Sequence, residues 1–207
     1  MAGWLETSGV LPKFDVCIGK GLDTPGGEFY EASEALISVF DLISGMSMAS
    51  GDMRKNAVTI QKLSAGGTTL KALVEAECAG KSEKELKKIA GDGATASCAL
   101  LWLARALNFV IKLLDVMIEE KTKKLSDCVM AGYEVSLKPH HGFMVKTTFK
   151  AAMAVAPARP DFMAKLADDE VEIKTQLDSV TPDIAKLLDS LNALLKGVNA
   201  KSLTAYA

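Results

Sequence analysis

Asp52 and Asn56 are the first pair of side chains whose types and spacing could do chemistry. They lie four residues apart, so on an α-helix they share one face. A carboxylate beside an amide suits sugar hydroxyls and an amide N–H, because together the two groups offer both acceptors and donors. The structural alternative is a first-turn acid that favours the helix dipole, with an exposed amide next to it. The spacing alone leaves both interpretations open.

Trp102 and Arg105 form a second pair, on a far more apolar segment. Within LLWLARAL the periodicity favours a core tryptophan, and an arginine on the polar stripe is more often a structural hydrogen-bonding group than a ligand contact. An indole can instead be a platform for the apolar face of a sugar ring. Helical geometry brings the two side chains to neighbouring positions in either case.

The other reactive residues match no catalytic or metal-binding pattern. His140 and His141 are the only histidines, and adjacent helical positions point about 100° apart, so one metal ion rarely binds both. The sequence has no nucleophile elbow, Walker loop, HExxH or GxGxxG motif. We therefore expect neither an enzyme nor a cofactor or metal site. Four widely spaced cysteines are expected to be reduced thiols, most of them in the core: Cys17, Cys78, Cys98 and Cys128.

The elements that must position these residues are organised around the segment from Ala94 to Ile118. A lipid-facing helix would lose about 2.5–3.5 kcal/mol for each charged residue at mid-bilayer. This segment carries several polar residues on one stripe, so we expect a buried central helix with one polar edge rather than a membrane span. From residue 99 onward, the stripe consists of Arg105, Asn108, Lys112 and Asp115.

Periodicity and breakers along the rest of the chain predict about eight helices in one all-α domain, residues 1–207. Residues 1–24 are expected to form a short helix or an irregular leader segment, with Thr24 as a cap for the next helix. Ser82 and Glu85 have the spacing of a capping box. Strand signals are nearly absent. The other predicted helices are 28–44, 46–63, 68–79, 82–90, 126–137, 140–156, a short helix from 159, and 168–198.

Composition narrows the classes of partner. The 207 residues include 24 Lys and Arg against 26 Asp and Glu, and no basic block or aromatic-interleaved basic stripe occurs. This balance argues against nucleic acid as a partner. The N-terminal sequence carries an acid early and has no apolar stretch of signal-peptide length. We therefore expect a cytoplasmic protein, acting as a monomer.

Four motifs, in order, resemble those of the glycolipid transfer protein family. Asp52-Met-Arg-Lys-Asn56 is similar to the Asp-x-x-x-Asn motif of that family, and the segment from Leu101 to Leu107 is similar to its Trp-Leu-x-Arg-x-Leu stretch. His141-Gly-Phe and the later Ala-Ala-Met-Ala-Val-Ala-Pro are similar to its His-Gly-aromatic and Ala-Ala-x-x-x-Ala-Pro stretches. The resemblance covers roughly residues 25 to 195. It implies a two-layer all-α helical sandwich that holds one sphingolipid.

The resemblance also implies a headgroup site. Trp102 would stack against the first sugar, and Asp52 and Asn56 would hydrogen-bond sugar hydroxyls. Asp52 would also accept from the ceramide N–H, while His141 would donate to the ceramide carbonyl. Further headgroup contacts are expected from Lys55 and Arg105.

The chains of the lipid set a further physical demand. Burying an acyl methylene is worth about 0.8 kcal/mol, so releasing some twenty to thirty such groups into water would cost on the order of 15–25 kcal/mol. We therefore expect a hollow apolar interior. The resemblance implies a cavity lined by Phe40, Leu107, Phe149 and Met153, and peripheral, reversible docking on a membrane through Phe143 and Trp4.

Departures from the family pattern bear on the headgroup. Thr59 stands seven residues after Asp52, where glycolipid binders of the family often carry a Lys. The ceramide-phosphate branch instead has a basic residue at the place of Asn56, and Arg both at that of Trp102 and one turn before, where this chain has Cys98.

A phosphate monoester needs charge-assisted donors, so a sugar headgroup is favoured. Arg54, Lys55 and Arg105 could partly substitute for the missing donors. The alternatives are therefore transfer or sensing of ceramide-1-phosphate, and a helical interaction scaffold that carries no lipid.

Overall fold

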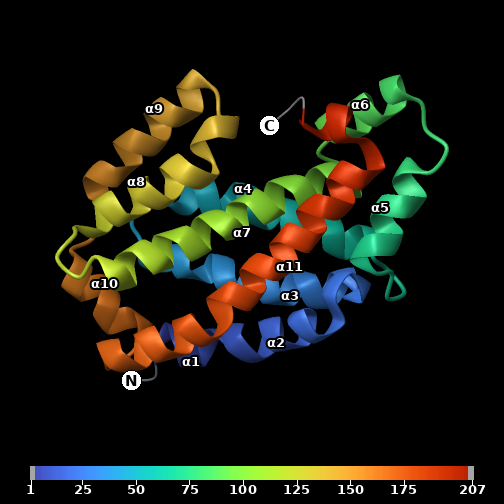
Figure 1. The fold of residues 1–207 in the computed structure, drawn as a ribbon. Coiled ribbons are helices and arrows are strands. Elements are labelled where there is room, and N and C mark those ends of the chain that lie inside the picture. The colour runs from blue at the N-terminus through green and yellow to red at the C-terminus, as the bar shows by residue number, and fades with distance from the viewer. Residues whose placement is uncertain (1–2, 205–207) are drawn as a thin grey trace.

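The structure, a computed structural model, describes residues 3–204. Within these residues it is all-α, as predicted, but it has eleven α-helices rather than about eight (Figure 1). The α-helices are α1 (Trp4–Ser8), α2 (Val10–Lys20), α3 (Gly26–Ile37), α4 (Ser47–Leu63), α5 (Leu70–Cys78), α6 (Glu83–Gly91), α7 (Ala96–Glu119), α8 (Leu125–Ser136), α9 (Phe143–Ala152), α10 (Arg159–Leu166) and α11 (Glu170–Thr204). Four 3-10 helices join them: η1 (Gly21–Asp23), η2 (Ser38–Leu42), η3 (Lys138–His140) and η4 (Met153–Val155).

The N-terminal segment forms two helices that are part of the core, which agrees with the helical alternative of the prediction and not with an irregular leader. Gly9 adopts the left-handed region at φ +62° and separates α1 from α2. Leu5 and Phe14 are buried, and α2 packs against α3 and α11. The prediction that Thr24 caps the next helix is wrong, because α3 has Pro25 at its N-cap position and no side-chain cap hydrogen bond. The Thr24 hydroxyl instead donates to the carbonyls of Cys17 and Gly21.

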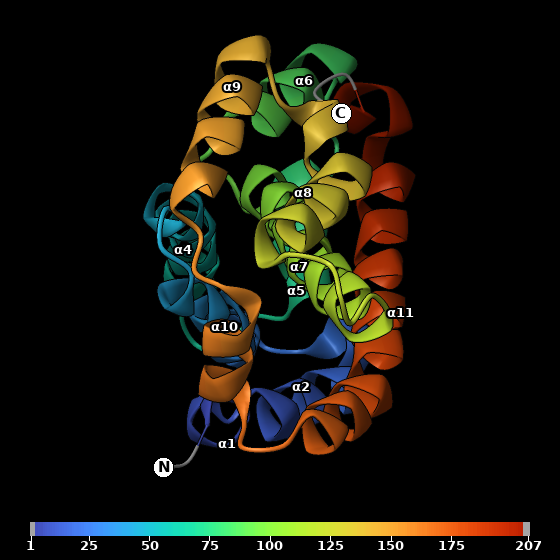
Figure 2. The ribbon, with the colours of Figure 1, turned by 90° about the vertical axis from the view of Figure 1, so that its left-hand side faces the viewer.

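Helix α7 is the centre of the molecule, as its composition predicts. It packs against α8, α4, α11 and α3, and Figure 2 shows it between α4 and α11. Among the described residues it is the one helix long and apolar enough to cross a membrane, but 78% of its most apolar window is buried inside the protein. Its polar stripe is only half-buried, and Lys112 pairs with Asp115 at 3.3 Å. A core helix with one polar edge is therefore confirmed.

The first turn of α7 is capped from a distant part of the chain. The Thr95 hydroxyl accepts from the backbone N–H of Cys98, and the Glu77 carboxylate accepts from those of Ala96 and Ser97 at 2.9 and 2.7 Å. Helix N-terminal N–H groups lack intrahelical partners and favour negative charge, so Glu77 satisfies both requirements and ties α5 to α7. The predicted capping box of Ser82 with Glu85 is present at the start of α6.

A close approach of α8 to α7 positions the segment that follows. A Cβ at Gly132 would lie 2.8 Å from the Leu113 backbone nitrogen, so glycine allows the two backbones to touch. After α8, Pro139 lies in η3, and His141 adopts an extended conformation. The helix predicted from residue 140 therefore begins at Phe143 instead, which leaves His141 on a connection between two helices.

Candidate functional site

Trp102 and Arg105 of α7 meet His141, which follows α8 and η3. The indole and imidazole rings stack with centroids 5.8 Å apart and planes 20° apart, and the Arg105 Cζ lies 5.0 Å from the indole centroid. All three side chains are half-buried. The tryptophan is therefore neither a fully enclosed core residue nor an isolated platform.

The residues predicted on α4 supply the carboxylate and the amide. Asp52 and Lys55 are exposed and Asn56 is half-buried. The Asn56 amide donates to the backbone carbonyl of Asp52 at 3.1 Å, which leaves its side-chain oxygen as an acceptor. Thr59 donates its hydroxyl to the Lys55 carbonyl, so the residue at the place of the family's Lys is engaged within its own helix.

Electrostatics link Asp52 to His141. Burial lowers the pKa of His141 below its ordinary value of 6.5, whereas the negative charge of Asp52 raises it and the positive charges of Lys146 and Arg105 lower it further. The carboxylate of α4 and the imidazole after η3 are therefore close enough to interact. The structure thus stacks an indole against an imidazole from two separate segments, and the charge of an acid on a third segment acts on that imidazole.

Two residues of this site were not singled out as ligands by the sequence. Tyr133 of α8 is buried, and its hydroxyl lies 3.0 Å from Nδ1 of His141. The buried Nδ1 of His140 has no hydrogen-bond partner among the residues that the structure describes. Burial lowers the pKa of His140, as do the neighbouring charges of Arg105 and His141. No local pattern marks Tyr133, because its partner lies beyond the end of its helix.

Arg54 belongs to a separate ion-pair cluster. Its guanidinium donates to both carboxylate oxygens of Asp41, at 3.0 and 2.7 Å, and to Glu34 at 2.6 Å. The hydrogen bond to Asp41 raises the pKa of Arg54, although burial partly opposes it. Since these partners lie on η2 and α3, Arg54 clamps α4 to its neighbours. The interpretation of Arg54 as a substitute phosphate donor is therefore not supported.

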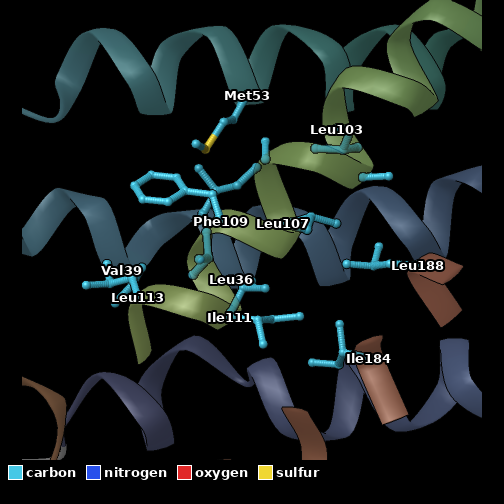
Figure 3. Packing of buried hydrophobic residues seen from close by; sticks show 14 of the residues in the cluster. Leu36, Val39, Met53, Leu103, Leu107, Phe109, Ile111, Leu113, Ile184 and Leu188 are labelled. Atoms are coloured by element: carbon cyan, nitrogen blue, oxygen red, sulfur yellow. The ribbon is translucent and has the colours of Figure 1, made fainter. Parts of the chain in front are cut away.

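The residues expected to line a hollow are packed against other side chains. Phe40, Leu107, Phe149 and Met153 are all buried. Figure 3 shows Met53 of α4 pointing toward Phe109 of α7, beside Leu107. Phe40 and Phe149 therefore both contact the Phe109 ring, and a chain cavity lined by these four residues stays a prediction. Two surface pockets, of about 340 and 510 Å³, lie elsewhere, along α11.

Four aromatic rings make this core continuous from η2 to α9, and we call them the aromatic cluster: Phe40, Phe109, Tyr133 and Phe149. The rings of Phe40 and Phe109 stack with their centroids 5.3 Å apart, and Phe149 meets Phe109 edge-on with a centroid distance of 5.7 Å. Phe149 also stacks on Tyr133 at 3.9 Å. Because Tyr133 contacts His141, the aromatic cluster joins the apolar interior directly to the polar site.

The two residues expected to dock on a membrane differ completely in exposure. Phe143, at the start of α9, is 83% exposed, and its neighbour Met144 is 81% exposed. Trp4 is buried, and its indole N–H donates to the Ser38 hydroxyl at 2.7 Å. The prediction for Trp4 is therefore wrong, because α1 lies against η2 and α10 and its tryptophan is part of the core.

Comparison with known proteins identifies the family. The sequence profile described as "Glycolipid transfer protein (GLTP)" matches residues 25–168. The chain belongs to the glycolipid transfer protein family. It is 32% identical over 180 residues, 84% of each chain, to a glycolipid transfer protein of Aureobasidium melanogenum. Members of this family are lipid transfer proteins rather than enzymes, which confirms the expectation from the missing catalytic motifs.

Solved structures support the same fold. The chain is similar to the crystal structure of HET-C2, a fungal glycolipid transfer protein, with 33% identity, a TM-score of 0.63, and 83% of this chain and 85% of that one covered. It is also similar to Arabidopsis ACD11 in complex with ceramide-1-phosphate, with a TM-score of 0.80 and 98% of both chains covered. At 20% identity, the second likeness shows the fold alone.

Proposed function

We propose that this protein binds a glycosylated sphingolipid, a glycosylceramide, and transfers it between membranes without a covalent step. The observation that carries the proposal is the stacking of the half-buried Trp102 indole on the His141 imidazole, on which the charge of Asp52 acts, in a chain of the glycolipid transfer protein family. These groups match what a glycosylceramide presents: hydroxyls, a sugar face and an amide. Selectivity would come from this polar site and affinity from the buried chains.

Each group has a role in the proposed complex. Trp102 stacks on the first sugar, and Asp52 and Asn56 hydrogen-bond sugar hydroxyls. Asp52 also accepts from the ceramide N–H, and His141 donates to the ceramide carbonyl. Lys55 and Arg105 contribute donors at the rim. The Arg105 guanidinium lies over the indole of Trp102, so it would lie next to a sugar that contacts this tryptophan.

Charge favours a sugar over a phosphate headgroup. A phosphate monoester calls for several charge-assisted donors. Arg54 is held by Glu34 and Asp41, and the thiol of Cys98 is buried, with burial raising its pKa. The other cations assigned to the site are Arg105, which lies over the Trp102 ring, and the exposed Lys55. Ceramide-1-phosphate, the ligand in the ACD11 complex, is therefore the second candidate.

The lipid chains would enter by displacing side chains of the aromatic cluster. We propose that the helices form two layers, and that the chains lie between η2, α7, α8 and α9. Phe40, Leu107, Phe149 and Met153 would then line the opened space. Methylene groups of the lipid would replace ring contacts at similar apolar area, so opening the cluster costs little once a chain is present.

Docking would use Phe143 together with its neighbour Met144. Both side chains are almost fully exposed at the first turn of α9, next to His141. Apolar side chains at this position could enter the membrane interface while the polar site faces the lipid headgroups. The contact would be peripheral and reversible, and we propose that the protein acts as a cytoplasmic monomer.

Transfer between vesicles tests the proposal directly. Fluorescent glucosylceramide and fluorescent ceramide-1-phosphate would be followed in parallel with the full-length protein. We expect glucosylceramide transfer, and we expect Asp52→Val and Trp102→Ala each to abolish it without loss of helical content. Asp15→Val, at an exposed acid of α2, is the matched control and should transfer normally.

Each other outcome has a definite meaning. Transfer of ceramide-1-phosphate alone would select the second candidate. Normal transfer by both site variants would show that the residues are assigned wrongly. If neither lipid is transferred and native mass spectrometry finds no retained lipid, the chain is a helical scaffold.

A further inference from the structure

Tyr133 is the one buried polar side chain of the aromatic cluster. It is 1% exposed, and its ring stacks on Phe149 at 3.9 Å and meets Phe109 edge-on at 6.3 Å. Its hydroxyl lies 3.0 Å from Nδ1 of His141. The backbone beside it is held against α7, because Gly132 touches Leu113. The position of this hydroxyl is therefore set by the core.

The direction of the hydrogen bond follows from counting protons. A neutral imidazole carries one N–H, on either Nδ1 or Nε2, and a tyrosine hydroxyl carries one proton to donate. If Nδ1 carried the proton, it would donate to the hydroxyl, and the buried tyrosine proton would need a second acceptor. Within the described residues, Nδ1 of His141 is the partner that the structure gives to this hydroxyl. An unsatisfied buried donor is costly, so the tyrosine O–H donates and Nδ1 accepts.

The consequence falls on the other ring nitrogen. With Nδ1 accepting, the single proton of a neutral His141 must be on Nε2. An Nε2–H group can donate to a carbonyl oxygen, whereas a bare Nε2 would present a lone pair and repel it. The stacked Trp102 ring restrains the imidazole plane at the same time.

We propose that Tyr133 is a positioning residue that holds His141 in its Nε2–H tautomer and thereby gives the site a donor for the amide carbonyl of the bound lipid. This inference rests on the proposed function and deepens it. Tyr133 does not touch the carbonyl in this arrangement; it acts through His141. Because Tyr133 contacts both His141 and Phe149, the protonation of the polar site also depends on how the aromatic cluster packs.

The test uses Tyr133→Phe, which removes the hydroxyl and keeps the ring. Nitrogen-15 NMR of histidine-labelled, lipid-free protein reads the tautomer, and a His140→Gln variant assigns the two histidines. We expect the Nε2–H form of His141 in the unsubstituted protein and a mixture of tautomers in Tyr133→Phe. Tyr30→Phe, at a half-buried tyrosine of α3, is the matched control and should leave the tautomer unchanged.

Binding of two lipids separates positioning from a general loss of structure. Glucosylceramide has the amide carbonyl, whereas glucosylsphingosine has a free amine and no carbonyl. We expect Tyr133→Phe to weaken glucosylceramide binding about tenfold, the scale of one hydrogen bond, and to leave glucosylsphingosine binding unchanged. A merely structural role would weaken both lipids equally.

Three results would overturn the inference. One is an Nδ1–H tautomer of His141 in the unsubstituted protein, a measurement that does not depend on lipid binding or on the Tyr133→Phe variant. Another is a Tyr133→Phe protein with unchanged tautomer and unchanged glucosylceramide binding. The third is an equal loss for both lipids. Failure of the unsubstituted protein to bind glucosylceramide would instead refute the proposed function itself, and the role of Tyr133 with it.

Discussion

Phe149 offers the sharpest test of how the lipid chains enter. Its ring contacts both Phe109 and Tyr133, and it is 8% exposed. Phe149→Ala would leave a cavity at the centre of the aromatic cluster. Substitutions of this kind lower the free energy of unfolding by about 3–5 kcal/mol. For a chain of this length, each kcal/mol corresponds to about 2–4 °C, so the melting temperature should fall by about 6–20 °C.

The lipid-bound state should lose less stability than the free protein. If a chain occupies the space beside residue 149, its flexible methylenes fill part of the cavity that the substitution leaves. Recovery of about half of the loss would amount to about 1.5–2.5 kcal/mol. Through thermodynamic linkage, glucosylceramide should then bind Phe149→Ala about 10- to 60-fold more tightly than it binds the unsubstituted protein.

Two measurements check this prediction, and one variant controls it. Thermal unfolding by circular dichroism gives the stability loss, and titration with fluorescent glucosylceramide gives the affinity. Phe162→Ala, in α10, removes a fully buried ring outside the aromatic cluster, so it should lower stability without raising affinity. If Phe149→Ala binds the lipid no more tightly than Phe162→Ala does, the chains do not enter through the aromatic cluster.

Three further predictions address capping, protonation and docking. Glu77→Gln keeps an acceptor but loses the charge at the start of α7, so the free energy of unfolding should fall by about 1 kcal/mol in urea titrations; an unchanged midpoint would contradict the capping role. Burial lowers the pKa of both His140 and His141 below 6.5, so the unfolded chain takes up protons first as the pH falls. The free energy of unfolding should therefore decrease from about pH 7.5 down toward the folded pKa values, with a shallower slope in His141→Gln; equal slopes would refute the shift. Trp4→Phe should lower stability by about 1 kcal/mol and leave vesicle binding unchanged, whereas Phe143→Ala should weaken vesicle binding alone; the reverse pattern would restore Trp4 as a docking residue.

Helix geometry explains why much of this protein was predictable. The central helix α7, its polar edge and the capping box of Ser82 with Glu85 all depend on residues three or four apart, and such spacings act within a single helix. The ordered motifs from Asp52 to Pro157 were likewise sufficient to indicate the family. The roles of individual site residues stay predictions until binding is measured.

Partners far apart in the chain were not predictable in the same way. Glu77 caps a helix that begins 19 residues later, and Trp4 donates to Ser38, 34 residues away. Neither contact has a regular spacing in the sequence by which it could be predicted, because each depends on how whole helices pack. The packing of residues 4–20 against α3 and α11 was not predictable for the same reason.

The sequence by itself determined an all-α chain and a buried central helix, and it supplied the residues from which a sugar-and-amide site is proposed. Only the tertiary structure decided that Arg54 is held by acids of two other elements, that Tyr133 meets His141, and that aromatic rings fill the interior. Local hydrogen bonding and helical periodicity act over a few residues and can be seen in the order of amino acids. Core packing depends on contacts between side chains of different helices. The order of amino acids does not show which of these side chains will be in contact.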